Sequence, residues 1–200
     1  MNRPVLQVAL DLVELDRALV IAGEAVTGGA DWLEVGTPLI KSEGVRAITK
    51  IRDAFPDHLV IADMKTADTG AIEVEMAAKA GADIVCVLGA SDDSVIEESV
   101  RAARKYGVNI MADLISVINP SKRSEELEKL GVDYLCAHTG IDQQMTGTDS
   151  LELLQKVIGK VNIPVAAAGG MSEKTASAAV AAGARIVIVG GAIIRSSDVI

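Results

Sequence analysis

Short apolar runs alternate with longer segments of helical periodicity along the whole chain of 200 residues. The runs are rich in β-branched residues and have apolar side chains on both faces, which is typical of strands in a covered parallel sheet. We expect strands at Leu6 to Ala9, Trp32 to Val35, Leu59 to Met64, Ile84 to Leu88, Asn109 to Leu114, Tyr134 to Ala137, Val165 to Ala168 and Ile186 to Val189. The segments between them predict helices at Leu15 to Thr27, Gly44 to Ala54, Ala71 to Ala80, Ser94 to Tyr106, Glu125 to Leu130, Leu151 to Ile158 and Lys174 to Ala182.

Four related segments indicate an internal repeat: GGADWLEVG, AGADIVCVLG, LGVDYLCAHTG and AGARIVIVGG. Their shared glycines, at positions 29, 81, 131 and 183, are 52, 50 and 52 residues apart, and each is expected to end a helix before a strand. Each period holds two β/α units, so four periods predict a single α/β domain over residues 1–200, a closed (β/α)8 TIM barrel. No Gly-x-Gly-x-x-Gly follows the first strand, which disfavours an open dinucleotide-binding sheet.

The end of the chain departs from this regular pattern. After the eighth predicted strand and Gly190, only Gly191 to Ile200 remain, whereas an average helix alone takes about 11 residues. We therefore expect either a barrel that lacks the full C-terminal helix or another element that covers this part of the barrel.

The third predicted strand carries unusual charge in the stretch LVIADMKTADTG. Alternation along a strand places Ile61, Asp63 and Lys65 on one face, and Asp68 follows shortly after. Burying an aspartate and a lysine costs several kcal/mol, on the order expected for desolvating charges, unless they pair or bind a ligand. This strand is therefore the first candidate for a functional site.

Polar residues also stand at the ends of other predicted strands: Asp11, Glu34, Asp113 and His138. Each has a structural alternative, namely a helix N-cap for Asp11, a strand-end charge for Glu34, a loop anchor for Asp113 and a satisfied core histidine for His138. Because barrel enzymes place reacting groups where strands end, the whole set predicts one active site.

Glycine pairs follow the last two predicted strands, Gly169-Gly170 and Gly190-Gly191. In this architecture the loops after these strands are the usual phosphate site, because backbone N–H groups can approach the phosphate oxygens there. Tight turns are the alternative explanation for the glycines.

The amino-acid composition narrows the classes of molecule that the protein can bind. Aromatic residues make up 2% of the chain and the formal net charge is -9, which argues against nucleic acid. No apolar run is long enough for a membrane span or a signal-peptide core, so we expect no membrane partner and a cytoplasmic location. Cys86 and Cys136 lie in strand-like runs without metal-ligand spacing and are expected to be buried and reduced.

At these residues the chain resembles the orotidine 5'-monophosphate decarboxylase suprafamily. The mark of the group is Asp-x-Lys-x-x-Asp on the third strand, here Asp63-Met-Lys65-Thr-Ala-Asp68. The supporting segments LQVALDL, EVGTPLI, AHTGIDQQ, AAGG and VGGAI span nearly the whole chain.

The set is most similar to the members that join formaldehyde to D-ribulose 5-phosphate, or run the reverse, in a Mg2+-dependent aldol reaction through an enediolate. The resemblance implies that Glu34 and Asp63 bind Mg2+ and that Asp11 and Lys65 contact substrate oxygens. It further implies that Asp68 enters the site of the second subunit of a homodimer. His138 then resembles the acid/base residue, and Gly170, Gly191 and Ala192 resemble phosphate contacts.

The chemistry of these residue types agrees with the resemblance. Carboxylates are ligands that Mg2+ prefers, and a cation beside an enediolate stabilises charge that develops in the transition state. Lys65, flanked in sequence by Asp63 and Asp68, should remain protonated. A protonated lysine is a poor Schiff-base nucleophile, which disfavours a lysine-imine aldolase.

Two other functions stay open. The members that decarboxylate 3-keto-L-gulonate 6-phosphate share the acidic residues, the lysine and the histidine, but they have an arginine three positions after the histidine, where this chain has Ile141. A nucleotide decarboxylase is disfavoured because few groups remain to bind a pyrimidine. The alternative of another class is a non-catalytic sugar-phosphate-binding barrel.

Overall fold

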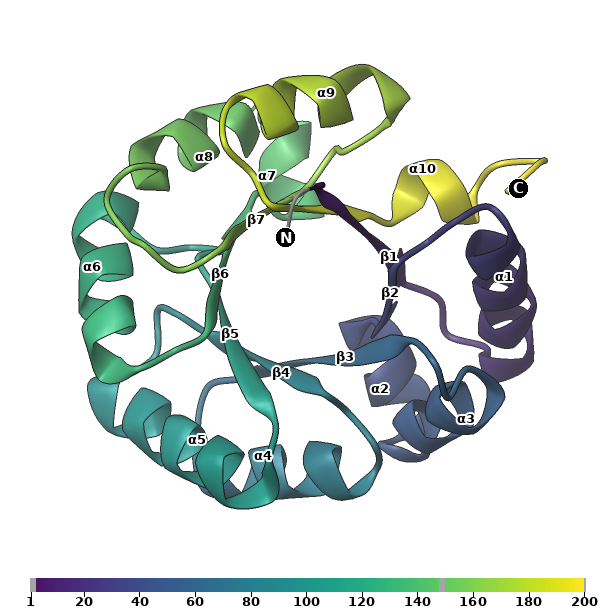
Figure 1. Cartoon of the computed structure of the whole chain (residues 1–200), viewed down its shortest axis with the longest axis horizontal. Coiled ribbons are helices and arrows are strands. Elements are labelled where there is room, and N and C mark those ends of the chain that lie inside the picture. Colours follow the sequence, from purple (N-terminus) through teal and green to yellow (C-terminus); the bar gives the residue numbers. More distant parts are fainter. Residues whose placement is uncertain (1–2, 148–149, 200) are drawn as a thin grey trace.

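A computed structural model describes residues 3–147 and 150–199 of the chain. Within them, eight parallel strands pair in chain order and close on themselves, with helices around the outside (Figure 1). The strands are β1 Val5–Leu10, β2 Trp32–Val35, β3 Leu59–Thr66, β4 Ile84–Leu88, β5 Asn109–Asp113, β6 Tyr134–His138, β7 Val165–Ala168 and β8 Ile186–Val189. The (β/α)8 barrel and all the expected strands are confirmed.

The helices also follow the predicted order. They are α1 Leu15–Thr27, α2 Thr37–Glu43, α3 Arg46–Ala54, α4 Gly70–Lys79, α5 Asp93–Tyr106, α6 Pro120–Leu130, α7 Ile141–Met145, α8 Ser150–Val157, α9 Glu173–Ala181 and α10 Gly191–Ile194. Of these, α2, α7 and α10 were not predicted. The four-residue α10 agrees with the expectation that no full helix follows β8 in the described part of the chain.

The predicted start of α6 at Glu125 is wrong by five residues. The helix begins at Pro120, and the Asn119 side chain caps it by accepting a hydrogen bond from the Lys122 backbone N–H at 3.2 Å. Proline is favoured in the first turn because it has no N–H to leave unpaired there. The apolar periodicity appears only in the second half of this helix, so it located the end and not the start.

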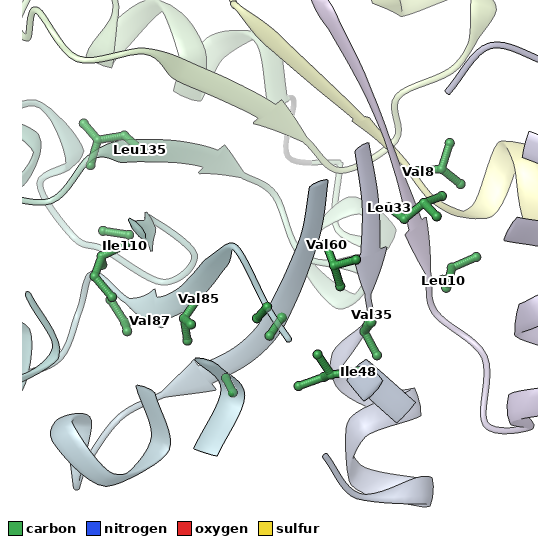
Figure 2. Packing of buried hydrophobic residues seen from close by; sticks show 14 of the residues in the cluster. Val8, Leu10, Leu33, Val35, Ile48, Val60, Val85, Val87, Ile110 and Leu135 are labelled. Atoms are coloured by element: carbon green, nitrogen blue, oxygen red, sulfur yellow. The ribbon is translucent and has the colours of Figure 1, made fainter. Parts of the chain in front are cut away.

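The apolar side chains form two cores. The larger core lies between the strands and the helices, and Figure 2 shows Val8, Leu33, Val60, Val85 and Ile110 pointing into it. The smaller core fills the barrel and includes Trp32, Ile61, Met111, Cys86 and Cys136. Both cysteines are free and buried, as predicted. Trp32 and Tyr134 pack edge to face at 5.8 Å between ring centroids inside the barrel. The charged residues at the strand ends therefore lie next to a packed apolar core inside the barrel.

The internal repeat has a structural counterpart at the other end of the barrel. The four repeat glycines have φ between 92° and 113°, a left-handed conformation that glycine adopts without strain. Two residues on, Asp31, Asp83 and Asp133 each accept a hydrogen bond from a strand N–H, those of Leu6, Val60 and Ile110 at 2.9, 2.7 and 2.8 Å. The same carboxylates pair with Arg3, Arg52 and Arg104. Arg185 occupies this position in the fourth repeat.

Candidate active site

The predicted polar residues do gather at the carboxyl ends of the strands. Glu34 lies in β2, Asp63 and Lys65 in β3, and His138 ends β6, while Asp11 follows β1 directly. Glu34 and Asp63 are buried, and the other side chains are partly exposed. Because the barrel is closed, these strand ends surround one opening.

Lys65 is the charge at the centre of the site. Its Nζ lies 2.7 and 3.0 Å from the two carboxylate oxygens of Asp63 and 3.2 Å from Oδ2 of Asp113. Burial opposes the charge, but Asp63 and Asp113 outweigh it and raise the pKa of Lys65 above its ordinary value. Lys65 is therefore protonated as predicted, although its second acidic partner in this chain is Asp113 and not Asp68.

The backbone aims Lys65 into the site. Its φ is +47°, and the pairing of β3 with β4 shifts register between Ala62 and Thr66. A left-handed lysine is uncommon and costs on the order of 1–2 kcal/mol. The irregularity turns the strand end so that Nζ reaches carboxylates on both β3 and β5.

Asp113 also contacts the histidine. Its Oδ2 lies 2.8 Å from Nδ1 of His138, and its Oδ1 accepts from the backbone N–H of Ile115 at 2.9 Å. Burial would raise the pKa of Asp113, but the hydrogen bond and charge of His138, with Lys65, hold it below its ordinary value. The carboxylate therefore fixes one ring nitrogen of His138, and the other is available for proton transfer.

The remaining acids repel one another. The pKa of Glu34 is raised well above its ordinary value, first by burial and then by the nearby charges of Asp63 and Asp11. A hydrogen bond from the Gln7 side chain to Oε2 of Glu34, at 2.6 Å, opposes this shift only in part. Burial and Asp63 likewise raise the pKa of Asp11. Asp63 is held by a hydrogen bond from the Thr37 hydroxyl at 2.7 Å. Several carboxylates that destabilise each other's charge are an arrangement that a cation relieves.

The donor set fits Mg2+. Glu34 and Asp63 offer carboxylate oxygens, which are the ligands that hard divalent cations prefer. Glu34 is the register partner of Ile61 on the neighbouring strand, and Asp63 follows Ile61 by two residues on the same face, so both acids lie in one region of the barrel. They are therefore the residues that would hold the ion.

The glycine pairs border the same opening. Gly169 has φ +94°, and a Cβ there would lie 2.1 Å from the carbonyl oxygen of Thr139, next to His138, so only glycine fits. A Cβ on Gly190 would lie 3.0 Å from Oδ2 of Asp11. Gly170 follows the first pair, and Gly191 and the exposed Ala192 begin α10. The predicted phosphate contacts are thus beside the acids.

A positive side chain accompanies the second glycine pair. The Arg195 guanidinium lies over Gly191, where its atoms would be 2.6–2.9 Å from a Cβ built on that glycine. An arginine beside backbone N–H groups suits a phosphate. Arg195 has no neighbouring motif, so sequence reasoning did not select it.

Asp68 is the one predicted site residue that this chain does not bring into the cluster. It is exposed, and its Oδ1 accepts only from the adjacent Thr69 N–H, at 2.7 Å, among the bonds found in the described residues. Its assignment to the site of a second subunit stays a prediction.

Besides Arg195, the sequence did not point to Gln7 or Thr37, and it placed Asp113 in the site only as a strand-end acid without a stated role. Gln7 is fully buried in β1 beneath Glu34, and a polar residue in an apolar strand was the signal for it. Thr37 follows EVG, and nothing in the local pattern revealed its contact with Asp63. Asp113 was visible as a strand-end acid, but its two partners depend on the pairing of β4, β5 and β6.

Comparison with known proteins defines the class. The family model described as orotidine 5'-phosphate decarboxylase / HUMPS family matches residues 4–200. The chain belongs to this family, and it is an enzyme of the lyase class.

Within the family, the chain is similar to 3-hexulose-6-phosphate synthases, which confirms the resemblance seen in its motifs. It is 42% identical to the enzyme of Bacillus subtilis (strain 168) over 194 residues, covering 96% of this chain and 92% of the relative. It is 41% identical to the enzyme of Mycobacterium gastri over 193 residues, covering 96% and 93%. The crystal structure of 3-hexulose-6-phosphate synthase from Salmonella typhimurium superposes with a TM-score of 0.92 at 38% identity, covering 98% and 92%.

In the part of the chain that the structure describes, no helix combines the length and apolar character needed to cross a membrane.

Proposed function

We propose that the protein catalyses the Mg2+-dependent aldol reaction between D-ribulose 5-phosphate and formaldehyde, giving D-arabino-hex-3-ulose 6-phosphate, and its reverse. The observation that carries the proposal is the chain of contacts Asp63–Lys65–Asp113–His138 beside Glu34 and Asp11. It combines a fixed ammonium, an oriented imidazole and a carboxylate cation site. The name shared by the similar proteins supports the same reaction.

The residues divide the reaction between them. The phosphate binds at the glycine pairs with Arg195 nearby, and this places the other end of the ketose among the acids. His138, oriented by Asp113, removes the C1 proton and leaves an enediolate. The Lys65 ammonium stabilises its negative charge. C1 then attacks formaldehyde, and His138 returns the proton to the new hydroxyl oxygen, so protons balance over the cycle.

The cation site has a separate part. Glu34 and Asp63 would hold Mg2+, and the bound ion would supply positive charge for the oxygens that become negative in the transition state. Asp63 also anchors Lys65, so one carboxylate would serve both the ammonium and the cation site. Asp11, next to Gly190, is positioned to orient a substrate hydroxyl.

The test is product identification. The purified protein is incubated with D-ribulose 5-phosphate, formaldehyde and MgCl2, and the sugar phosphate is identified by mass spectrometry and NMR. We expect a hexulose phosphate that no longer forms after chelation of the metal and that Lys65→Ala does not make. Binding of the pentose phosphate without turnover, or turnover that chelation does not affect, would contradict the proposal and favour a binding barrel or a metal-independent enzyme.

The structure gives no support to the decarboxylase alternative. Ile141, the position where those members have an arginine, begins α7 with an exposed apolar side chain. Such a side chain cannot deliver a proton to the enediolate, which leaves the intermediate free for an aldehyde. Ile141→Arg should raise decarboxylation of 3-keto-L-gulonate 6-phosphate relative to aldol formation, and an unchanged ratio would remove this argument.

We also propose that the protein acts as a homodimer in which Asp68 completes the partner's site. Asp68 is exposed at the end of β3, at the same end of the barrel as Lys65, and does not reach Lys65 within its own chain. On the helix that follows, Ile72 and Met76 are exposed one turn apart. Apolar side chains exposed in this way, next to a charge that the site needs, support a shared interface.

A further inference from the structure

A second group of ligand atoms lies on the β5–β6 side of the barrel. Asp113, Cys136 and His138 each offer one such atom, and these atoms all lie within 4.8 Å of one another. Asp113 and Cys136 are register partners on β5 and β6, and His138 follows Cys136 by two residues on the same face of β6. The sheet itself therefore assembles the group.

We propose that Asp113, Cys136 and His138 form a site for a soft divalent transition metal, with Zn2+ as the representative ion. Oxygen, sulfur and nitrogen donors together are the set that Zn2+ takes, whereas Mg2+ requires oxygen ligands. The carboxylates of Glu34 and Asp63 suit the hard cation, so the two groups discriminate between ions by donor type. Three protein ligands leave a fourth position open.

The distances allow the ion with a small adjustment. Nδ1 of His138 and Oδ2 of Asp113 are 2.8 Å apart, whereas two ligands at zinc distances in a tetrahedron are separated by about 3.3 Å. This pair therefore has to open by about half an ångström, and Sγ of Cys136, which lies within 4.8 Å of the other two ligand atoms, has to come to about 3.6 Å from each of them. Lys65 gives up its longer contact, 3.2 Å to Asp113, and keeps Asp63. The ion displaces the Cys136 thiol proton and any proton between Nδ1 and the carboxylate, and these protons go to solvent.

The site is reachable from the surface. The His138 side chain is 21% exposed and lines a cavity of about 170 Å3 together with Thr139, Ser116 and Gln143. Binding would hold His138 and Asp113 as ligands and so stop proton transfer, an effect that rests on the proposed function. The binding itself does not.

Cobalt provides the test, because a thiolate bound to Co2+ gives a charge-transfer band in the near ultraviolet. Metal-free protein is titrated with CoCl2 in excess MgCl2, and then with ZnCl2. We expect the band to appear and to be displaced by about one equivalent of Zn2+. Cys86→Ala should keep the band, because Cys86 belongs to no such three-ligand group among the described residues, and Cys136→Ala should lose it.

The cobalt titration tests the proposal even if the Cys136→Ala variant fails to fold. The chain has two cysteines, so a band that survives in Cys86→Ala already assigns the ligand to Cys136. Absence of the band in the wild type, or its loss in Cys86→Ala, would overturn the proposal.

Turnover gives the second readout. At saturating Mg2+, Zn2+ should inhibit the wild type and Cys86→Ala alike, with an inhibitory concentration at least tenfold higher for Cys136→Ala. Equal inhibition of all three proteins, or inhibition that added Mg2+ fully reverses, would place Zn2+ at the carboxylates instead and overturn the proposal. A cobalt band in a protein without aldol activity would contradict the proposed function and leave the metal site standing.

Discussion

Asp113 connects two residues on which the chemistry depends. It accepts from Lys65 and from His138 with the same oxygen, and burial leaves it no solvent to replace either partner. We expect Asp113→Asn to lower kcat by about 10²-fold or more, because the imidazole loses its orienting charge. Steady-state kinetics on the purified variant measure this, and Asp142→Asn, which neutralises an exposed acid on α7, is the matched control.

A double variant separates orientation from a general loss of charge. If Asp113 acts through His138, then Asp113→Asn combined with His138→Gln should be no slower than His138→Gln alone. Multiplied losses of kcat would show that the two residues act independently.

The buried carboxylate of Glu34 should lower the thermal stability of the metal-free protein. Its pKa is raised above the ordinary value of 4.5, so the contribution of Glu34 to the stability of the metal-free protein should be most favourable below that pH and should be lost as pH rises toward the folded-state pKa. Glu34→Gln removes the buried charge. At pH 7 it should raise the Tm of the metal-free protein by at least about 2–4 °C, the shift produced by 1 kcal/mol in a domain of this size.

Calorimetry from pH 4 to pH 8, with and without MgCl2, tests this expectation. The advantage of Glu34→Gln should shrink toward pH 4, and Mg2+ should stabilise the wild type more than the variant. A variant less stable than the metal-free wild type at pH 7 would show that Gln7 already compensates the buried charge.

At the scale of the elements, Asp31, Asp83 and Asp133 form a repeated aspartate clamp that adds side-chain contacts between neighbouring strands at the amino end of the barrel. Asp83 accepts from the buried Val60 N–H and pairs with Arg52, which also donates to the carbonyls of Gly81 and His58. Asp83→Ala leaves these donors without the carboxylate, so we expect a loss of about 1–3 kcal/mol in unfolding free energy.

Urea denaturation measures that loss, with Asp57→Ala as a control of the same charge change at an exposed position nearby. The KM for the pentose phosphate should not change, because the clamp lies at the opposite end of the strands from the site. A destabilisation no larger than that of Asp57→Ala would mean that the clamp does not contribute to stability.

The elements also show what the sequence could and could not predict. The strands and long helices were predictable because each buries an apolar face, and Asp63 and Lys65 were predictable because charge in a buried strand is costly. The short helix α7, reading IDQQM, buries no side chain and so has no apolar pattern. The partners of Asp113 come from strand register, and the left-handed Lys65 from a local shift in that register. These are tertiary properties.

For the whole molecule, the position of Asp68 decides whether one chain holds a complete site. Within the described chain, Lys65 meets Asp63 and Asp113, and Asp68 stays on the surface before α4. A homodimer of the proposed kind would bring the partner's copy of this acid to the opening. Ile72→Glu should then weaken dimerisation and activity together, because it places charge on an exposed apolar position of α4.

Subunit mixing tests the shared site directly. Lys65→Ala and Asp68→Ala should each be inactive alone, since every site in either homodimer lacks one group. A mixed dimer has one site with both defects and one with neither, because the intact lysine and the intact aspartate come from different chains. Random mixing makes half of the dimers mixed, so about a quarter of wild-type activity should return. No recovery in a mixture shown by mass spectrometry to contain mixed dimers would mean that Asp68 does not serve the partner's site.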